Sequence, residues 1–259
     1  MPRVAQHVVE ARRQRVAELL REHRYLGVDD VARHTGVSQN TARRDLAVLA
    51  EREEVTRTFG GAVAAYDRGF ASFGDRLRKN VQAKRLIASA AAKLVEAGMH
   101  VYLDAGSTIA LVAEVLATAP PRSLLVTTHS IAVAERCGRA GVEVRVLGGR
   151  WLPNQACVLD ERTVDEAGSF EYDLALLGAE AIDVRGASNT DETVVALQRR
   201  VRLLARRCVL CVDAEKLGGE AAVRLAGWDE IDTLCTNATT LMLRRVGIDL
   251  PAAKLQLAR

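Results

Sequence analysis

Long apolar runs are missing from this chain of 259 residues. No stretch approaches the length needed to cross a membrane, and the N-terminus lacks the apolar core of a signal peptide. Both absences favour a cytoplasmic protein without a membrane partner. Aromatic residues are also scarce, at 4%, but apolar residues make up 49% and charged residues 27%, the balance of a globular protein. The length suffices for one large domain or two smaller ones.

A strong charge of one sign is missing too. The formal net charge of +3 is too small to indicate nucleic-acid binding by itself. Lysine, however, is absent from residues 1–66, where 11 Arg stand against 9 Asp and Glu. Arginine makes bidentate contacts with phosphate and guanine, so the cations of this segment are of the kind that suits DNA.

Cysteines are few and odd in number, and they have no partner residues at metal-ligand spacing. They are Cys137, Cys157, Cys208, Cys211 and Cys235. Cys208 and Cys211 form a C-x-x-C pattern, but the apolar residues between them are typical of a buried strand. We expect reduced core cysteines rather than a redox or zinc pair, and neither a metal site nor a cofactor.

The first fifty residues show helical patterns. Residues 8–24 predict an amphipathic helix that Gly27 interrupts. A second short helix is expected from about Asp29 to Thr35, with Asp29 or Asp30 as its N-cap. Gly36 then permits a tight turn before the next helix.

Ser38 is placed to cap a third helix that runs to about Arg52. Residues 55–63 predict a small β-hairpin with Gly60 and Gly61 near its turn. We expect residues 1–63 to form one domain and residues 64–80 to form a linker.

From residue 81 the pattern changes to apolar strands that alternate with helical segments. The strand candidates are VYLDAG, SLLVTT, VEVRVLGG, DLALLGA, CVLCVD and IDTLCTN. This alternation predicts an α/β domain with a largely parallel sheet over residues 81–259. Several strands end in small or polar residues, at the edge where open α/β sheets bind ligands.

Residues 28–49 have the pattern of a helix-turn-helix. Ala32 is small enough for two helices to cross closely, and Gly36 supplies the turn. The expected shared core is Val31, Val37, Ala42, Leu46 and Leu49. The expected outward face, which would present side chains to the major groove, is Gln39, Asn40, Arg43 and Arg44.

Hydroxyls and a wing complete the predicted DNA-binding surface. Ser38 and Thr41 are placed to bind phosphate at a helix N-terminus. Arg57 and Thr58, on the hairpin, would reach the neighbouring backbone. The alternative is a small helical dimerisation or linker domain whose arginines form a solvated face.

Two strand ends predict an effector pocket. After residues 100–104, the turn Ala105–Thr108 places Gly106, Ser107 and Thr108 at a helix N-terminus, a cradle for phosphate or carboxylate, and Asp104 can accept from a sugar hydroxyl. Thr127–Ser130, which includes Thr128, repeats this arrangement. The alternative is that these residues merely cap their helices, but two polar ends on one edge favour a shared pocket.

Two further residues are open between two roles. His129 is either a ligand contact or a polar loop residue, and the other histidines do not cluster with it. Lys216, in VDAEKLGG, either binds a phosphate or lies on the surface.

The segment SQNTARRDLAVLAEREEVTRTFGGAV resembles the N-terminal module of the DeoR family of bacterial regulators. In that family a Ser-x-x-Thr-x-Arg-Arg-Asp-Leu recognition helix precedes a Gly-Gly wing. The matching residues here are Ser38, Thr41, Arg43, Arg44, Asp45, Leu46, Gly60 and Gly61. Ala42 departs from the usual Ile or Val. The resemblance implies a winged helix-turn-helix that binds DNA.

The remaining motifs, VYLDAGST, LLVTTHS, VLGG, YDLALLGAEAID and CVDAEKLG, resemble the DeoR-family sensor domain. The resemblance implies a fold similar to ribose-5-phosphate isomerase and an effector that is a phosphorylated sugar or related metabolite. The implied pocket is Asp104, Gly106, Ser107, Thr108, Thr128, Ser130, Gly178, Glu192 and Lys216. Two departures are QACVLD at 155–160, in place of a Gly-Pro turn, and Ala196, near the usual position of a Lys. A less charged effector therefore stays an alternative.

Taken together, these patterns predict a non-enzymatic regulator that binds double-stranded operator DNA. The resemblance implies a repressor that a small phosphorylated metabolite releases. One recognition helix reads only a few base pairs, so we expect a homo-oligomer, a dimer or higher. The main alternative is a sugar-phosphate isomerase-like enzyme with an appended DNA-binding domain. Glu192 would be its base, but no nucleophile–base pair is evident and Ala196 lacks the basic group. A purely structural DNA-organising protein is a weaker alternative.

Overall fold

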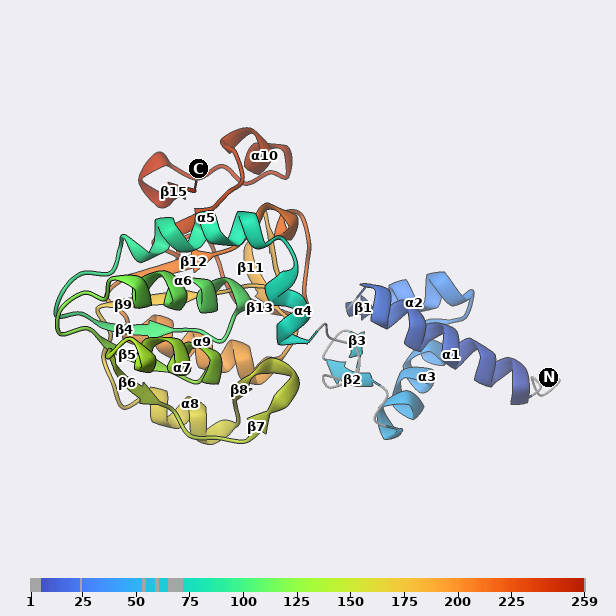
Figure 1. The fold of residues 1–259 in the computed structure, drawn as a ribbon. Coiled ribbons are helices and arrows are strands. Elements are labelled where there is room, and N and C mark those ends of the chain that lie inside the picture. The colour runs from blue at the N-terminus through green and yellow to red at the C-terminus, as the bar shows by residue number, and fades with distance from the viewer. Residues whose placement is uncertain (1–5, 24, 53–54, 59–60, 65–71, 259) are drawn as a thin grey trace. The chain divides into compact units, whose positions relative to one another are not determined.

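The computed structural model of the protein describes residues 6–23, 25–52, 55–58, 61–64 and 72–258. The chain divides into two compact units, Met1–Ala71 and Ser72–Arg259. Each unit has hydrophobic clusters of its own, and the helices and strands of both are labelled in Figure 1.

The first unit packs three helices against a small antiparallel sheet with strand order β1-β3-β2. Its elements are α1 (Gln6–His23), β1 (Tyr25–Gly27), α2 (Val28–Thr35), α3 (Gln39–Glu51), β2 (Val55–Thr58) and β3 (Gly61–Ala64). The predicted helices and hairpin are confirmed. The short strand β1 was not expected, because three residues are too few to show a pattern.

The caps of the two central helices differ from each other. Gly27 is the N-cap of α2 without a side-chain hydrogen bond, so the prediction of Asp29 or Asp30 as its cap is wrong. Both carboxylates lie in the first turn instead, where their negative charges interact favourably with the positive end of the helix dipole. Gly36 adopts the left-handed conformation, with φ of 66°, and Ser38 accepts a hydrogen bond from the Thr41 amide, as predicted.

The core of the first unit contains the predicted side chains. Val31, Ala42, Leu46 and Leu49 are buried, and Val37 packs against them. Each large apolar side chain contributes about 1.5–3 kcal/mol by leaving water.

One carboxylate is also buried in this core. Asp45 of α3 accepts hydrogen bonds from the Nε atoms of Arg12 (2.6 Å) and Arg13 (2.9 Å), both on α1. Asp45 thereby ties α1 to α3, so its place in the Arg-Arg-Asp-Leu segment is structural.

The second unit alternates strands and helices along its first half. The elements are α4 (Phe73–Arg78), α5 (Val81–Ala92), β4 (His100–Leu103), α6 (Ser107–Thr118), β5 (Leu125–Thr128), α7 (Ile131–Arg139), β6 (Glu143–Val146), β7 (Trp151–Leu152), η1 (Pro153–Gln155), β8 (Cys157–Val158) and α8 (Glu161–Ala167). Helix α4 falls within the segment 64–80 that was expected to be a linker, so the chain there is partly helical. Its six residues are too few to show a helical period.

The second half adds the remaining strands. The elements are β9 (Leu174–Leu177), β10 (Ala181–Asp183), β11 (Gly186–Asn189), α9 (Glu192–Leu204), β12 (Cys208–Cys211), η2 (Ala214–Lys216), β13 (Val223–Ala226), β14 (Thr233–Thr236), α10 (Thr240–Arg245), η3 (Ala252–Lys254) and β15 (Leu255–Leu257). All six predicted strands are present, but β7, β8, β10, β11, β13 and β15 were missed.

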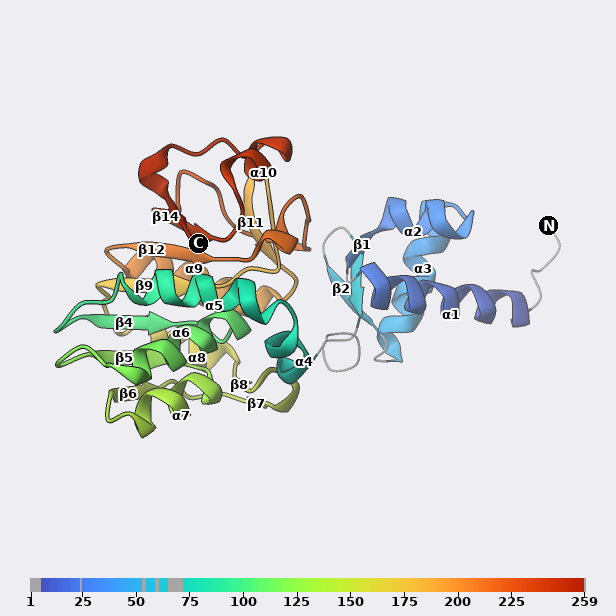
Figure 2. The same ribbon diagram turned by 45° about the horizontal axis from the view of Figure 1, so that its top comes forward.

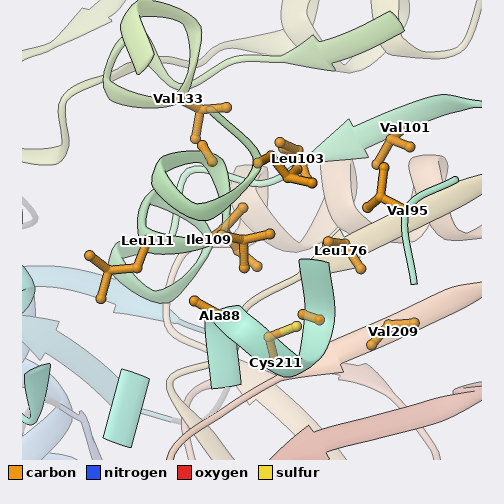
Figure 3. Close-up of a cluster of buried hydrophobic side chains, with 14 of the residues drawn as sticks. Ala88, Val95, Val101, Leu103, Ile109, Leu111, Val133, Leu176, Val209 and Cys211 are labelled. Atoms are coloured by element: carbon orange, nitrogen blue, oxygen red, sulfur yellow. The ribbon is translucent and has the colours of Figure 1, made fainter. Parts of the chain in front are cut away.

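A seven-stranded parallel sheet, with order β15-β14-β12-β9-β4-β5-β6, forms the centre of this unit. Helices α5, α6 and α7 cover one face, and α8 and α9 cover the other (Figures 1 and 2). A hydrophobic cluster lies on each side of the sheet, and Figure 3 shows the one beneath α5 to α7. The predicted α/β class with a largely parallel sheet is confirmed.

Two antiparallel additions border the main sheet. Strands β10, β11 and β13 form a three-stranded sheet, and β7 pairs with β8 in a hairpin closed by η1. The hairpin begins after the Val-Leu-Gly-Gly segment, and its turn contains Gln155.

The five cysteines are free and buried, which confirms the core prediction. Burial raises the pKa of Cys157 and of Cys208 to about 12, so both thiols stay protonated near neutral pH. Among the described residues, no helix combines the length and apolar character that a membrane crossing needs. The same residues contain no group of His, Cys, Asp and Glu placed to hold a metal ion.

The Asp45 contacts predict that two carboxylates of the first unit contribute differently to its free energy of unfolding. We expect Asp45→Asn to lower the free energy of unfolding of this unit by about 2–3 kcal/mol, because two arginines lose a buried charged acceptor. Amide hydrogen exchange of α1 and α3 in the full chain measures the change. Asp30→Asn is the control, since its pair with Arg33 is exposed and contributes about 0.5 kcal/mol or less. Equal effects of the two substitutions would contradict the anchoring role.

Candidate DNA-binding face and candidate effector site

The start of α3 presents the predicted polar face. Gln39, Asn40, Arg43 and Arg44 are all exposed. Arg43 donates to Asn40 Oδ1 (3.3 Å) and lies 3.5 Å from Gln39 Oε1. Because Asp45, Leu46 and Ala42 hold the other side of α3 in the core, these four side chains are directed to solvent.

The hydroxyl groups lie at the N-terminus of the same helix. Ser38 Oγ and Thr41 Oγ1 are 3.0 Å apart, and Ser38 Oγ also accepts from the Thr41 amide at 3.3 Å. Arg57 and Thr58 lie on β2, as predicted for a wing strand, but their side chains lie outside the described part of the chain. Gly60 also lies outside it, whereas Gly61 begins β3.

The candidate effector site lies at the carboxyl edge of the parallel sheet. Asp104, His129, Gly178 and Asp213 follow the ends of β4, β5, β9 and β12. Parallel pairing brings all these ends to one edge. A Cβ built on Gly178 would lie 3.7 Å from Asp104 Oδ2 and 3.9 Å from the Gly106 Cα, so these turns are in close contact.

Asp104 is the centre of a buried hydrogen-bond network. Its Oδ1 accepts from the Ala105 amide (2.8 Å), and its Oδ2 accepts from the Gly178 amide (2.9 Å) and Gln198 Nε2 (2.7 Å). Gln198, on α9, also donates to the Gly178 carbonyl and accepts from Asn189 of β11 (2.6 Å). The network therefore connects β4, β9, β11 and α9 at the sheet edge.

The end of β5 is buried beside this network. Thr128 Oγ1 donates to the Leu103 carbonyl (2.6 Å) and accepts from the Ser130 amide (3.0 Å). Ser130 caps α7 by accepting from the Val133 amide. These contacts give both hydroxyls a structural role, whatever else they bind.

His129 lies inside the molecule rather than in an exposed loop. Its Nδ1 is 2.8 Å from the Tyr102 hydroxyl, and its Nε2 is 3.9 Å from Asp104 Oδ1. Burial lowers the pKa of His129, although the Asp104 carboxylate opposes this shift, so the ring is neutral near pH 7.

The N-terminus of α6 contributes the predicted turn. Gly106 is the N-cap, so Ser107 is the first helical residue and its side chain makes no capping bond. Ser107 and Thr108 are largely buried at this terminus. Their amides belong to a helix start, which attracts anions.

Cations gather on one side of this edge, and sequence reasoning found only one of them. Lys84, on α5, is buried and donates from Nζ to the Arg76 carbonyl of α4. Burial lowers the pKa of Lys84 to about 8, with Asp213 opposing the shift and Lys216, Arg76 and Lys79 adding to it. The nearby Asp213 caps η2, which contains the predicted Lys216.

Gln155 extends the site from the β7–β8 hairpin. Its Oε1 accepts a hydrogen bond from Arg76 Nη2. Arginine has only donors, so this contact determines which end of the amide faces Arg76. Within the described residues, Gln155 Nε2 and Arg76 Nε are buried without a hydrogen-bond partner.

One predicted residue does not join these contacts. Glu192 is exposed in the first turn of α9. The residue of this helix that hydrogen-bonds to Asp104 is Gln198. Gln198, Asn189, Gln155, Arg76 and Lys84 were missed. Gln198 and Lys84 could have been found as polar residues at expected buried positions of a helix. No pattern in the neighbouring sequence indicates that Gln155 belongs to the site.

Comparisons with known families cover both units. Residues 12–67 match the model of the DeoR-like helix-turn-helix domain. Residues 79–238 match the model of the DeoR C-terminal sensor domain. The second match alone spans more than half of the chain.

Curated relatives match over most of their length. The chain is 28% identical to the HTH-type transcriptional repressor GlcR of Bacillus subtilis, over 91% of this chain and 93% of that protein. It is 27% identical to the glycerol-3-phosphate regulon repressor of Escherichia coli, over 86% and 88%. Among solved structures, it is similar to ribose 5-phosphate isomerase A of Methanocaldococcus jannaschii, with a TM-score of 0.38 and 20% identity over 54% and 55% of the two chains.

The Asp104 network predicts a high cost for losing its amide. We expect Gln198→Leu to lower the free energy of unfolding of the second unit by about 2–4 kcal/mol, because Asn189, the Gly178 carbonyl and Asp104 each lose a partner. Urea unfolding followed by tryptophan fluorescence measures this, since Trp151 and Trp228 both lie in this unit. Ala196→Ser, exposed on the same helix, is the control, with an expected change within about 0.5 kcal/mol. A loss for Gln198→Leu no larger than the control's would disprove the network's importance.

Proposed function

Since this chain belongs to the DeoR family of transcriptional regulators, we propose that it is a repressor that a small phosphorylated metabolite releases from operator DNA. Its target is a carbohydrate or related metabolic operon. The observation that carries this proposal is that the chain has both features: the start of α3 in the first unit exposes polar side chains, and the sheet edge in the second unit is bordered by cations.

The DNA contact belongs to α3. Gln39 and Asn40 suit adenine edges, and Arg43 and Arg44 suit guanine or phosphate. Ser38 and Thr41 bind a backbone phosphate at the helix start, and Arg57 and Thr58 approach the adjacent backbone from the wing. The Asp45 contacts support this assignment, because they fix which side of α3 is exposed.

Replacing the two arginines singly tests the recognition face. We expect Arg43→Ala and Arg44→Ala to weaken operator binding while the fold is kept, since both side chains are exposed. A base-reading arginine loses about 1–3 kcal/mol and some sequence preference, whereas a phosphate contact lowers the salt slope by about one. Fluorescence anisotropy with the chain's own promoter region, at several salt concentrations, separates these results. Unchanged binding by both variants would refute the face, and Arg33→Ala serves as the exposed control on α2.

A homo-oligomer is expected because one recognition helix contacts a short stretch of DNA. A single recognition helix covers only a few base pairs, and half-sites about one helical turn apart provide the remaining specificity. We therefore propose a dimer or a higher oligomer on DNA.

The effector binds at the carboxyl edge of the main sheet. Lys84 and Lys216 provide positive charge for a phosphate, together with the amides at the start of α6 beside Gly106, Ser107 and Thr108. Asp104 Oδ1 has capacity for a further hydroxyl donor. Thr128, His129, Ser130, Gly178 and Glu192 complete the proposed lining. The similarity to the glycerol-3-phosphate regulon repressor of Escherichia coli supports a phosphorylated ligand.

Arg76 and Gln155 offer a route from this site to the start of the second unit. Each has a buried nitrogen donor without a partner among the described residues, and such a donor costs about 1–3 kcal/mol. An effector oxygen that satisfies them changes the contacts of α4, whose Arg76 carbonyl also holds Lys84. Helix α4 is the first element of the second unit, so its displacement is a suitable signal for release.

Catalysis is not part of this proposal. An isomerase-like enzyme needs an available carboxylate base and a basic partner. Glu192 is exposed, and Asp104 Oδ2 is already occupied by Gly178 and Gln198. The relatives named above are transcriptional repressors.

The lowered pKa of Lys84 predicts how effector affinity depends on pH. We expect one compound of a sugar-phosphate panel to release the DNA, with a dissociation constant that rises only about twofold from pH 7 to 8, because half of the Lys84 charge remains at its pKa. Above pH 8 the free protein loses the Lys84 charge, so the dissociation constant should rise by up to about tenfold per pH unit. Isothermal titration calorimetry across pH 7–9.5 measures this.

Lys84→Arg is the matched control, because its charge persists and the rise above pH 8 should vanish. A wild-type affinity that is flat to pH 9.5 would remove Lys84 from the anion site. A panel in which no compound affects DNA binding would overturn the effector proposal but leave DNA binding intact.

A further inference from the structure

Strand β6 is an edge of the main sheet, and it pairs with β5 alone among the described strands. The Leu147 amide donates to the Thr128 carbonyl. In a parallel pair, alternate residues direct both backbone groups to the same neighbour. Glu143 and Arg145 therefore face β5, as Leu147 does, and the backbone groups of Val144 and Val146 point away from the sheet.

The side chains of this edge are accessible as well. Glu143 is exposed, and Val146 keeps 42% of its surface exposed. Val144 packs on the cluster beneath α7, and Glu143 and Arg145 project from the opposite face because strand residues alternate. Arg145 lies over the Phe170 ring, with its Cζ atom 4.3 Å from the ring centroid. This stacking leaves its N–H edges available for an acceptor.

We propose that β6 pairs antiparallel with β6 of a second copy of this chain, with the two-fold axis at Val144. In this register the two Val144 residues exchange backbone hydrogen bonds, and the Val146 amide meets the Val142 carbonyl of the other copy. Glu143 then lies directly opposite Arg145 of the other copy, twice by symmetry. Exposed Val146 is covered by the apolar Val142.

Charge selects this register and this edge. A two-fold axis at Arg145 places two arginines opposite each other, and like charges in that position destabilise a strand pair. An axis at Val146 leaves both charged residues without an opposite charge. The other edge strand, β15, consists of Leu255, Gln256 and Leu257, which carry no charge for self-recognition. The pairing gives one continuous sheet across both copies and places the α7 helices of the two copies side by side.

Charge reversal with rescue tests the pairing in the full chain. Glu143→Arg and Arg145→Glu each create two like-charged pairs in a homodimer. We expect analytical ultracentrifugation of either variant to give half the mass of the wild-type species. An equimolar mixture of the two variants restores opposite charges at both pairs, so its mass should return to the wild-type value. Arg244→Glu, the same charge change on α10, should keep the wild-type mass.

A backbone variant provides an independent test. Val144→Pro removes an outward amide and changes one side chain at the border of the cluster, but the ladder to β5 is kept, so circular dichroism should stay close to that of the wild type. Its expected mass is again half that of the wild type. A monomeric wild-type protein at tens of micromolar, single variants that keep the wild-type mass, or a mixture that fails to rescue would each overturn the pairing.

Discussion

Parallel strand pairing is the constraint from which the rest of the second unit follows. It brings the ends of β4, β5, β9 and β12 to one edge, so polar residues that are far apart in sequence meet there. It also requires a crossover connection between parallel neighbours, and the helices in most of these connections cover both faces of the sheet. The sites that remain open are the carboxyl edge and the outer strands, where we place the effector and the second copy.

Buried carboxylates organise both units. Asp45 connects α1 to α3 through two arginines, and Asp104 connects two strand ends and α9 through amides. A carboxylate withdrawn from water is stable only when its oxygens are paired, so each one specifies the arrangement of the groups around it. In each unit the framework thereby positions the neighbouring functional groups, an outward helix face in one and a polar sheet edge in the other.

The sites were only partly visible in the sequence. Ser38, Gly36 and the apolar spacing of α3 are local signals, and they predicted the exposed face correctly. Gln198 and Lys84 lie within helices, and the sequence does not show which groups a single polar side chain among apolar ones will contact. Gln155 lies in a hairpin turn 79 positions from Arg76, so no short-range pattern connects the two. Asp29 and Asp30 show the opposite failure, because good capping residues were displaced by Gly27.

By itself the sequence determined the longer helices and six of the seven parallel strands, since helix and strand periods and turn residues act over a few positions; the shortest strands and α4 were too short to show a period. It also determined the class of the sheet, because strands alternate with helices long enough for crossovers. Only the tertiary structure decided which polar groups become partners, how deeply Lys84 and His129 are buried, and which strands stay at the edges. Those properties depend on contacts between distant segments, and burial changes the energy of a charge or an amide far more than its neighbours in sequence do.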